Sequence, residues 1–148
     1  MENDVIIRKA VRADVPAILE LYEELLHEHT DLSNALNDFD SLEVSADTIY
    51  VAESECKVIG TIQLSVCKGI AFNCRPFITA EYLIVEKQYR NRGIGTKLLA
   101  KIDEIANSVN AECSFFVSSA HRTDAHSFYK KRGYADDVIG FRKTYNEE

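Results

Sequence analysis

Two hydrophobic periods alternate along this chain and predict the order of its strands and helices. After a plausible N-cap at Asp14 and Pro16 in the first turn, apolar residues follow the helical period. They are Ile18, Leu21, Tyr22, Leu25 and Leu26. Residues 57–67 follow the two-residue period of a strand instead, with Val58, Gly60, Ile62, Leu64 and Val66 on one face. Thr61, Gln63 and Ser65 occupy the other face, so we expect an antiparallel strand half exposed to water.

Shorter signals complete the predicted order. Further strands are expected over 4–11, 48–53, 77–85 and 113–118, the last of them buried, with terminal strands around Tyr134 and over 139–144. Further helices are expected around 32–36, from 94 to about 107–110, and over 124–131. The strand–helix–strand unit at 77–118 implies a right-handed parallel crossover. The sequence therefore predicts a mixed α/β fold: a mostly antiparallel central sheet flanked by helices on both faces, in one domain over 1–148.

The stretch from Thr79 to Lys101 has the form of an anion-binding site. An apolar strand leads through a charged turn, Arg90-Asn91-Arg92-Gly93-Ile94-Gly95, into an amphipathic helix. The first turn of a helix carries unpaired N–H groups and a partial positive charge, and glycines let a phosphate approach the backbone. The pattern lacks the Gly-Lys-Ser/Thr ending of the nucleotide P-loop and the third glycine of the dinucleotide fingerprint.

Composition narrows the class of partner. The net charge of -7 argues against nonspecific binding to nucleic acid or to an anionic membrane, and mildly favours a cationic substrate. No apolar run reaches the ~18 residues of a membrane span, and the acidic start lacks a signal-peptide pattern. The four cysteines show no metal or disulfide spacing, and the histidines at 27 and 29 point apart on a helix. We expect a cytoplasmic protein with reduced thiols and no metal site.

The glycine turn resembles the acetyl-CoA signature of the GNAT superfamily of N-acetyltransferases, Arg/Gln-x-x-Gly-x-Gly/Ala, as Arg90-x-x-Gly93-x-Gly95. A second GNAT pattern, Ala-x-x-x-Tyr-x-x-x-Gly-Phe/Tyr, is matched by Ala125, Tyr129, Gly133 and Tyr134. The resemblance implies the GNAT fold and acetyl-CoA as the acetyl donor. It places cofactor contacts at Leu83, Ile84, Val85, Arg90, Asn91, Arg92, Gly93, Ile94, Gly95 and Thr96. Backbone N–H groups freed where the strand splays near Leu83–Val85 would bond the thioester carbonyl.

Tyr129 is the residue that the resemblance makes the general acid for the departing thiolate. A phenol pKa near ~10 against a thiol pKa near ~8.5 requires proton transfer in concert with bond breaking, or a depressed phenol pKa. The alternative is a packing role beside Phe128 on an amphipathic helix. Many family members have Asn seven residues before this tyrosine, where this chain has Arg122, so that asparagine's contacts to the CoA arm do not carry over.

The general base is open between several groups. Glu81 lies in the central strand on the same face as Leu83 and Val85, where desolvation would make it a stronger base; a structural ion pair is the alternative. His121, His126 and a water chain are the other candidates. Cysteine catalysis is disfavoured, because Cys113 is expected in the core and Cys67 and Cys74 have no partner histidine.

These observations predict an N-acetyltransferase that moves the acetyl group of acetyl-CoA to a primary amine of a small molecule by direct attack. The segment from Arg122 to Tyr129 is similar to the tail motif of aminoalkylphosphonate N-acetyltransferases, which makes an aminoalkylphosphonate the first named acceptor. The alternatives are a catalytically silent acyl-CoA sensor and a protein N-acetyltransferase. The resemblance leaves a homodimer open.

Overall fold

A computed structural model describes residues 4–42 and 44–145, which form two compact units, one within 1–116 and one within 117–148. The single domain expected over 1–148 stays a prediction. In the first unit the elements are β1 (Ile6–Lys9), η1 (Arg12–Asp14), α1 (Val15–Leu26), α2 (Leu32–Leu42), β2 (Asp47–Ser54), β3 (Lys57–Cys67), α3 (Ala71–Cys74), β4 (Phe77–Val85), η2 (Lys87–Tyr89), α4 (Ile94–Ser108) and β5 (Ser114–Phe116). The second unit contains α5 (Thr123–Lys130).

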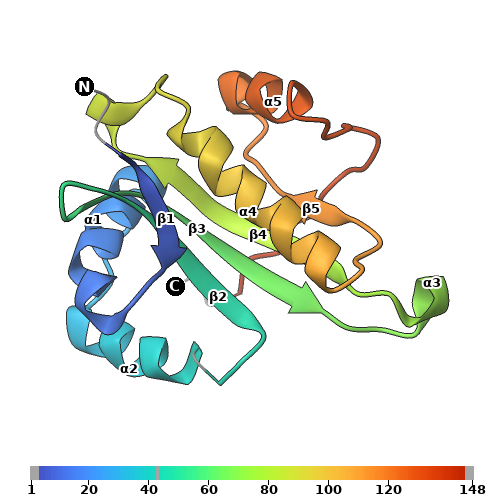
Figure 1. The fold of residues 1–148 in the computed structure, drawn as a ribbon, viewed down its shortest axis with the longest axis horizontal. Helices are drawn as coiled ribbons and strands as arrows, with labels where there is room; N and C mark the ends of the chain where they lie inside the picture. Colours follow the sequence, from blue (N-terminus) through green and yellow to red (C-terminus); the bar gives the residue numbers. More distant parts are fainter. Residues whose placement is uncertain (1–3, 43, 146–148) are drawn as a thin grey trace. The chain divides into compact units, whose positions relative to one another are not determined.

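The first unit is built on one sheet with strand order β1-β2-β3-β4-β5 (Figure 1). The pairs from β1 to β4 are antiparallel, and only β4 and β5 are parallel. α4 makes the crossover between these two strands, as the sequence predicted. The positive φ angles of Glu55 and Cys56 form the tight turn between β2 and β3. The predicted mixed, mostly antiparallel sheet is confirmed.

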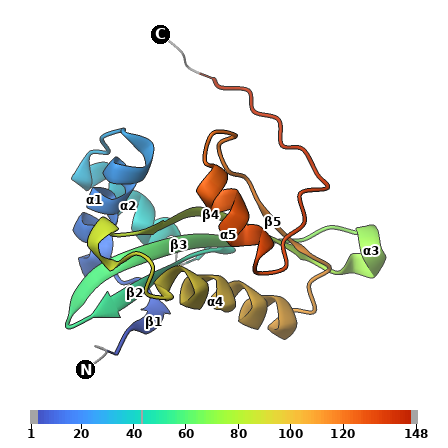
Figure 2. The same ribbon diagram turned by 90° about the horizontal axis from the view of Figure 1, so that it is seen from above.

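Helices cover both faces of this sheet, α1 and α2 on one side and α4 on the other (Figure 2). On the α1–α2 face, Val51 and Ile84 pack with Ile18, Leu21 and Phe39 of the helices. On the opposite face, Leu98 and Ile102 of α4 are fully buried. Covering both faces also corrects the expectation for β3: Thr61 is fully buried, with its hydroxyl donating to the Tyr50 carbonyl oxygen at 2.9 Å, so this central strand is not half exposed.

An ion-pair network holds the start of α1 against the sheet. Asp14 stands at the predicted N-cap position with Pro16 in the first turn, but its carboxylate makes no cap hydrogen bond. It accepts instead from the Arg8 guanidinium at 2.7 and 2.9 Å and from the Val11 N–H at 2.8 Å. The hydrogen bond from Arg8 lowers the pKa of Asp14, more than burial raises it. The network therefore ties β1 to the entry of α1.

The second unit departs from its prediction after α5. The helix is confirmed, and Gly133, at φ 91°, makes the expected turn, where the Tyr134 N–H bonds the Tyr129 carbonyl at 3.2 Å. The terminal strands expected around Tyr134 and over 139–144 are absent from the described residues up to 145. A strand needs a backbone partner, and none pairs with this tail there.

The edge of the sheet and the turns supply smaller corrections. β5 is shorter than expected and half exposed, and Cys113 before it is exposed rather than in the core. The expected helix at 32–36 extends to Leu42, and a helical turn, α3, interrupts the expected loop before β4. Among residues 4–42 and 44–145, no helix has the length and apolar character needed to cross a membrane.

Candidate active site

β4 carries an irregularity at the point where the anion-binding stretch begins. Glu81 pairs with Gln63 and Ile84 pairs with Thr61, so three steps along β4 match two along β3. The extra residue is a β-bulge, and Tyr82 within it has φ 55°. The bulge also moves Glu81 onto the face of Ile84, because Gln63 and Thr61 share a face. The expectation that Glu81 faces the same way as Leu83 and Val85 is therefore wrong.

Beyond the bulge, one edge of β4 is open. β5 pairs with β4 only at 78–80, and in the described part of 1–116 no strand pairs with residues 81–85 on that side. The Glu86 N–H donates to the Ile59 carbonyl oxygen at 2.8 Å. The backbone N–H and C=O groups of alternate residues point to the same side of a strand. Those of Ile84 therefore also point toward β3, whereas those of Leu83 and Val85 point toward the open edge. Ile84 is also buried in the core, so its contribution would be to hold this edge rather than to touch a ligand.

The turn after β4 bends the chain into α4 through two left-handed residues, Asn91 at φ 62° and Gly93 at φ 79°. Gly93 is the N-cap of α4 and offers no side-chain cap, and a Cβ built on it meets nothing within 4 Å. The Ile94 side chain is buried, so only its backbone faces the turn. The helix therefore presents N–H groups of its first turn, including those of Ile94 and Gly95, to an open space. That geometry suits a phosphate.

The positive charges of the turn are held by local contacts. Arg90 donates from Nε to the Val85 carbonyl oxygen and from Nη2 to Glu24 of α1, at 2.8 and 2.7 Å. Arg92 and Lys57 both lie over the ring of Tyr89, at 5.5 and 5.4 Å from its centre. Arg90 therefore links β4 to α1 with part of its donors, while Arg92 adds positive charge beside the start of α4.

On the α1–α2 face, polar side chains lie in registered rows beside the bulge. One row contains Ile49, Gln63 and Glu81, and the next contains Asp47, Ser65 and Thr79. Ser65 donates to Asp47 across the strands. Glu81 is exposed, so the desolvation expected for this candidate base is absent. Its carboxylate is nevertheless next to the bulge, on the side that faces α1.

Tyr22 of α1 faces this polar region. Its ring lies 5.2 Å from that of Tyr82, and its hydroxyl oxygen is buried with no hydrogen-bond partner among the described residues. Burial, and then the nearby Tyr82 and Glu81, raises the pKa of Tyr22 above its usual range, so its hydroxyl stays protonated. A buried hydroxyl without a partner costs about 1–3 kcal/mol. In the sequence, Tyr22 belongs to the apolar stripe of a helix, and no pattern there indicates a site residue.

Tyr129, the candidate acid, lies in the second unit, whereas the glycine turn and the bulge lie in the first. It is half-buried on α5, with rings of Phe128 and Tyr134 at 5.6 and 6.3 Å. Burial raises the pKa of Tyr129, although Arg122 acts in the opposite direction. This direction is opposite to a depressed pKa, so it favours proton transfer in concert with bond breaking for an acid role. Of the candidate bases in this unit, His126 Nε2 lies 3.0 Å from the Ser119 carbonyl oxygen.

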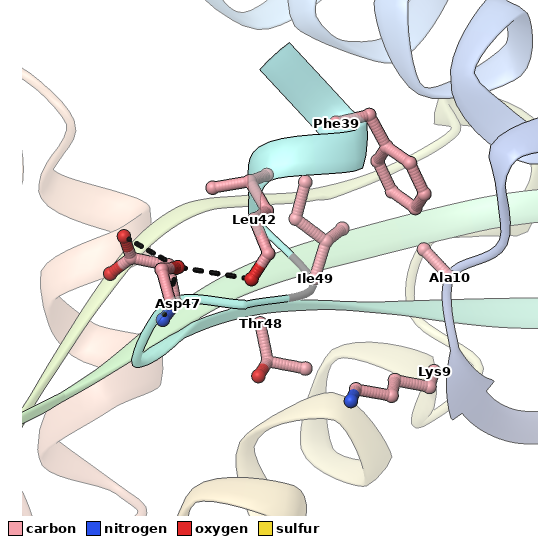
Figure 3. Close-up of a pocket in the computed structure, with 8 residues that line it drawn as sticks. Lys9, Ala10, Phe39, Leu42, Asp47, Thr48 and Ile49 are labelled. Carbon is pink, nitrogen blue, oxygen red and sulfur yellow. Dashed lines mark hydrogen bonds between the residues drawn. The ribbon is translucent and has the colours of Figure 1, made fainter. Parts of the chain in front are cut away.

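A cavity of about 250 Å³ lies at the other end of the sheet, where β2 begins (Figure 3). Its lining joins α2 to the first two strands and includes Phe39, Leu42, Ile49, Lys9 and Asp47. The glycine turn instead follows the end of β4, so this cavity is separate from it. No three histidine, cysteine or acidic side chains of the described ranges gather closely enough to hold a metal ion.

Comparison with known proteins agrees with this geometry. The family model described as acetyltransferase (GNAT) domain matches residues 45–136, which include the bulge, the glycine turn and α5. The aminoalkylphosphonate N-acetyltransferase of Salmonella typhimurium is 27% identical over 139 residues, covering 93% of this chain and 90% of that protein.

Solved structures show the same fold. A putative acetyltransferase from Agrobacterium tumefaciens superposes with a TM-score of 0.88 at 24% identity, covering 95% of this chain and 99% of that one. Glucosamine-6-phosphate N-acetyltransferase from Arabidopsis thaliana gives a TM-score of 0.87 at 20% identity, covering 97% and 99%. AAC(6')-Iy, in complex with the bisubstrate analog CoA-S-monomethyl-acetylneamine, gives 0.78 at 20% identity, covering 96% and 99%.

Proposed function

Because this chain belongs to the GNAT family of acetyl-CoA-dependent N-acetyltransferases, we propose that it transfers the acetyl group of acetyl-CoA to a primary amine of a small molecule by direct attack. The observation that carries the proposal is the open edge of β4 at the bulge, followed directly by the glycine turn and the start of α4. One extended ligand with an acyl group at one end and phosphates at the other would meet both features in this order.

The donor would be held along this path by backbone and charge. The N–H groups of Ile94 and Gly95 at the start of α4, with the cation of Arg92 nearby, would bind the phosphates. The outward N–H groups of Leu83 and Val85 would bond the pantetheine arm and the thioester carbonyl. Donors fixed by the strand stabilise the negative charge that develops on that oxygen without reorganising. Asn91 and Thr96 flank the phosphate contacts.

The transfer itself requires two proton movements. The acceptor must lose a proton before its nitrogen forms the new bond to the acetyl carbon, and Glu81, exposed beside the bulge, would accept that proton directly or through water. As the carbon–sulfur bond breaks, the thiolate would take a proton from Tyr129 in the same step. Concerted transfer is the favoured route, because burial raises the pKa of Tyr129. Electrons and protons then balance, with an amide and a free thiol as products.

The test is thiol release from acetyl-CoA in the presence of different amines, with an aminoalkylphosphonate first because the Salmonella relative is named for that acceptor. We expect amine-dependent release in the wild type and a loss of about 10²-fold or more in Tyr129→Phe. Tyr145→Phe, at an exposed position of the same unit, should change nothing.

Each contrary result removes a different part of the proposal. Unchanged release in Tyr129→Phe would return that residue to a packing role on α5. Tight acetyl-CoA binding without release for any amine would favour the acyl-CoA sensor. Release with peptides but with no small amine would favour the protein N-acetyltransferase.

A further inference from the structure

The two helices that cover one face of the sheet, α1 and α2, contain no lysine or arginine. Between Arg12 and Lys57 the sequence contains no lysine or arginine at all. Over the same region, residues 15–42 carry seven carboxylates: Glu20, Glu23, Glu24, Glu28, Asp31, Asp38 and Asp40. Arg90 pairs with Glu24, Arg12 pairs with Asp40, and Lys57 interacts electrostatically with Glu20, so the carboxylates of this segment outnumber the cations beside it. This side of the first unit is anionic.

The sheet surface beneath these helices has the same character. The two rows that contain Glu81 and Asp47 also contain Gln63, Ser65 and Thr79, and neither row contains a lysine or arginine. Neighbouring strands lie about 4.8 Å apart and alternate residues about 6.6 Å apart along a strand. The two carboxylate-bearing positions, two strands and one alternate step apart, are therefore roughly 12 Å from each other. A ligand that lies across this face meets two acids and several neutral hydrogen-bonding groups.

Tyr22 supplies an independent sign that a ligand binds here. Phenylalanine would make the same contact with Tyr82 and fill the same space without a buried, unpartnered oxygen. The hydroxyl stays protonated, since burial raises the pKa of Tyr22, and it can therefore both donate and accept a hydrogen bond. It lies over the bulge, next to the side chains of Tyr82 and Glu81. A polar ligand group at this position would satisfy it.

We propose that the acceptor binds on this face, around Tyr22, Glu81 and Gln63, and that it is an amine carrying a second ammonium group, such as a diamine or polyamine. The inference rests on the proposed transfer to an amine and names its substrate class. Two carboxylates attract a dication more than a monocation. A phosphonate would meet like charges instead, and Arg8, Arg12 and Arg90 on this side are already paired with carboxylates. The Tyr22 hydroxyl positions the reactive amine beside the bulge.

Binding is measured separately from transfer, by calorimetric titration of putrescine, butylamine and 2-aminoethylphosphonate into the wild-type protein with CoA present. We expect putrescine to bind at least about tenfold more tightly than butylamine, and 2-aminoethylphosphonate most weakly. Glu81→Gln should weaken the binding of both putrescine and butylamine about tenfold, because Glu81 lies beside the amine that reacts. Tyr22→Phe should weaken both amines about tenfold, with acetyl-CoA affinity unchanged.

Tyr50→Phe is the matched control, because Tyr50 lies on the opposite face, where Lys101 of α4 covers its ring at 5.3 Å. It should leave amine binding unchanged. Thermal unfolding separates packing from recognition: Tyr22→Phe should keep or raise the melting temperature, because it removes an unpartnered hydroxyl. A lowered melting temperature with unchanged amine affinity would show an internal role for that hydroxyl and overturn the inference.

The remaining outcomes are equally decisive. Equal affinity for putrescine and butylamine, or tightest binding of 2-aminoethylphosphonate, would overturn the substrate class. Putrescine bound as expected, with acetyl-CoA also bound but no thiol released, would support the acceptor site and contradict the transfer. Amine-dependent release that is identical in Tyr22→Phe at every amine concentration would support the transfer and contradict the acceptor site.

Discussion

Replacing Gly60 with alanine should push β4 away from β3 just beyond the bulge, where Leu98 of α4 lies close to Gly60. Gly60 pairs with Val85 in the sheet, and an added Cβ would lie 3.1 Å from the Ile84 carbonyl oxygen and 3.3 Å from Leu98 Cδ1. The carbonyl faces β3 and cannot retreat without disturbing the ladder. Leu98 is fully buried, so its side chain cannot turn out into solvent without leaving the core. Relief therefore requires a shift of backbone or helix.

The magnitude follows from two opposing effects. Overpacking a well-filled core costs typically about 1–3 kcal/mol. Replacing a strand glycine by alanine returns about 0.5–1 kcal/mol, because alanine loses less backbone entropy on folding. The net loss of unfolding free energy is then about 0–2.5 kcal/mol, and the loss relative to a glycine-to-alanine change without the clash is the full ~1–3 kcal/mol. For a chain of this length, with about 2–4 °C per kcal/mol, the net loss corresponds to a melting temperature lower by up to roughly 10 °C.

The assay is thermal and urea unfolding of Gly60→Ala beside Gly69→Ala. A Cβ on Gly69 meets nothing within 4 Å. The Gly69→Ala control therefore has the same reduced loss of backbone entropy on folding without the clash, and it should be neutral or slightly stabilising. Acetyl-CoA affinity should fall in Gly60→Ala alone, because Val85 and α4 both adjoin the added carbon. A Gly60→Ala variant as stable as the Gly69→Ala control would refute the packing argument.

Two further predictions concern the ion pair at α1 and the glycine turn. Arg8 lowers the pKa of Asp14, so this carboxylate stabilises the fold above its unfolded pKa of about 3.9 and the contribution is lost as the pH falls through the lower folded value. Asp14→Asn should therefore lose about 1.5–3 kcal/mol at pH 7. In urea unfolding the gap to the wild type should shrink below about pH 4, and a gap independent of pH would contradict the linkage. Gly93→Ala, at φ 79° with open space around its Cβ, should lose about 1–2 kcal/mol through backbone strain alone. Gly93→Asn should recover part of this in thermal unfolding, and equal stability of the two variants would count against strain.

The sequence predicts those helices and strands that are determined by a single hydrophobic period or by a single turn motif. β4 begins and ends at the predicted residues, and the predicted helices at α1, α4 and α5 are all present within a few residues. In each of these segments the local pattern and the tertiary packing favour the same structure. The tail after Gly133 contains apolar residues in alternation, but a strand also needs a partner backbone, which local sequence does not supply.

The site is predictable only where glycines and charges mark it. The turn from Arg90 to Gly95 can be predicted from the sequence, because few residue types allow a left-handed backbone next to the start of a helix. The bulge cannot be predicted from the sequence. Tyr82 at φ 55° is held there by tertiary structure, against the preference of tyrosine for negative φ angles. One inserted residue moved Glu81 to the other face of β4. The buried hydroxyl of Tyr22 is likewise invisible in a helical stripe of otherwise apolar residues.

The lengths of the strands have a consequence for self-association. The inner strands β2, β3 and β4 have 8, 11 and 9 residues, whereas the outermost strands have 4 in β1 and 3 in β5. A fibril grows when a long, flat, unpaired edge adds another chain, and short edges bearing charges such as Arg8 and Lys9 offer a poor template. Loss of β1 would uncover β2, a longer edge that contains no lysine or arginine. Variants that loosen the Arg8–Asp14 pair should therefore aggregate before they unfold completely.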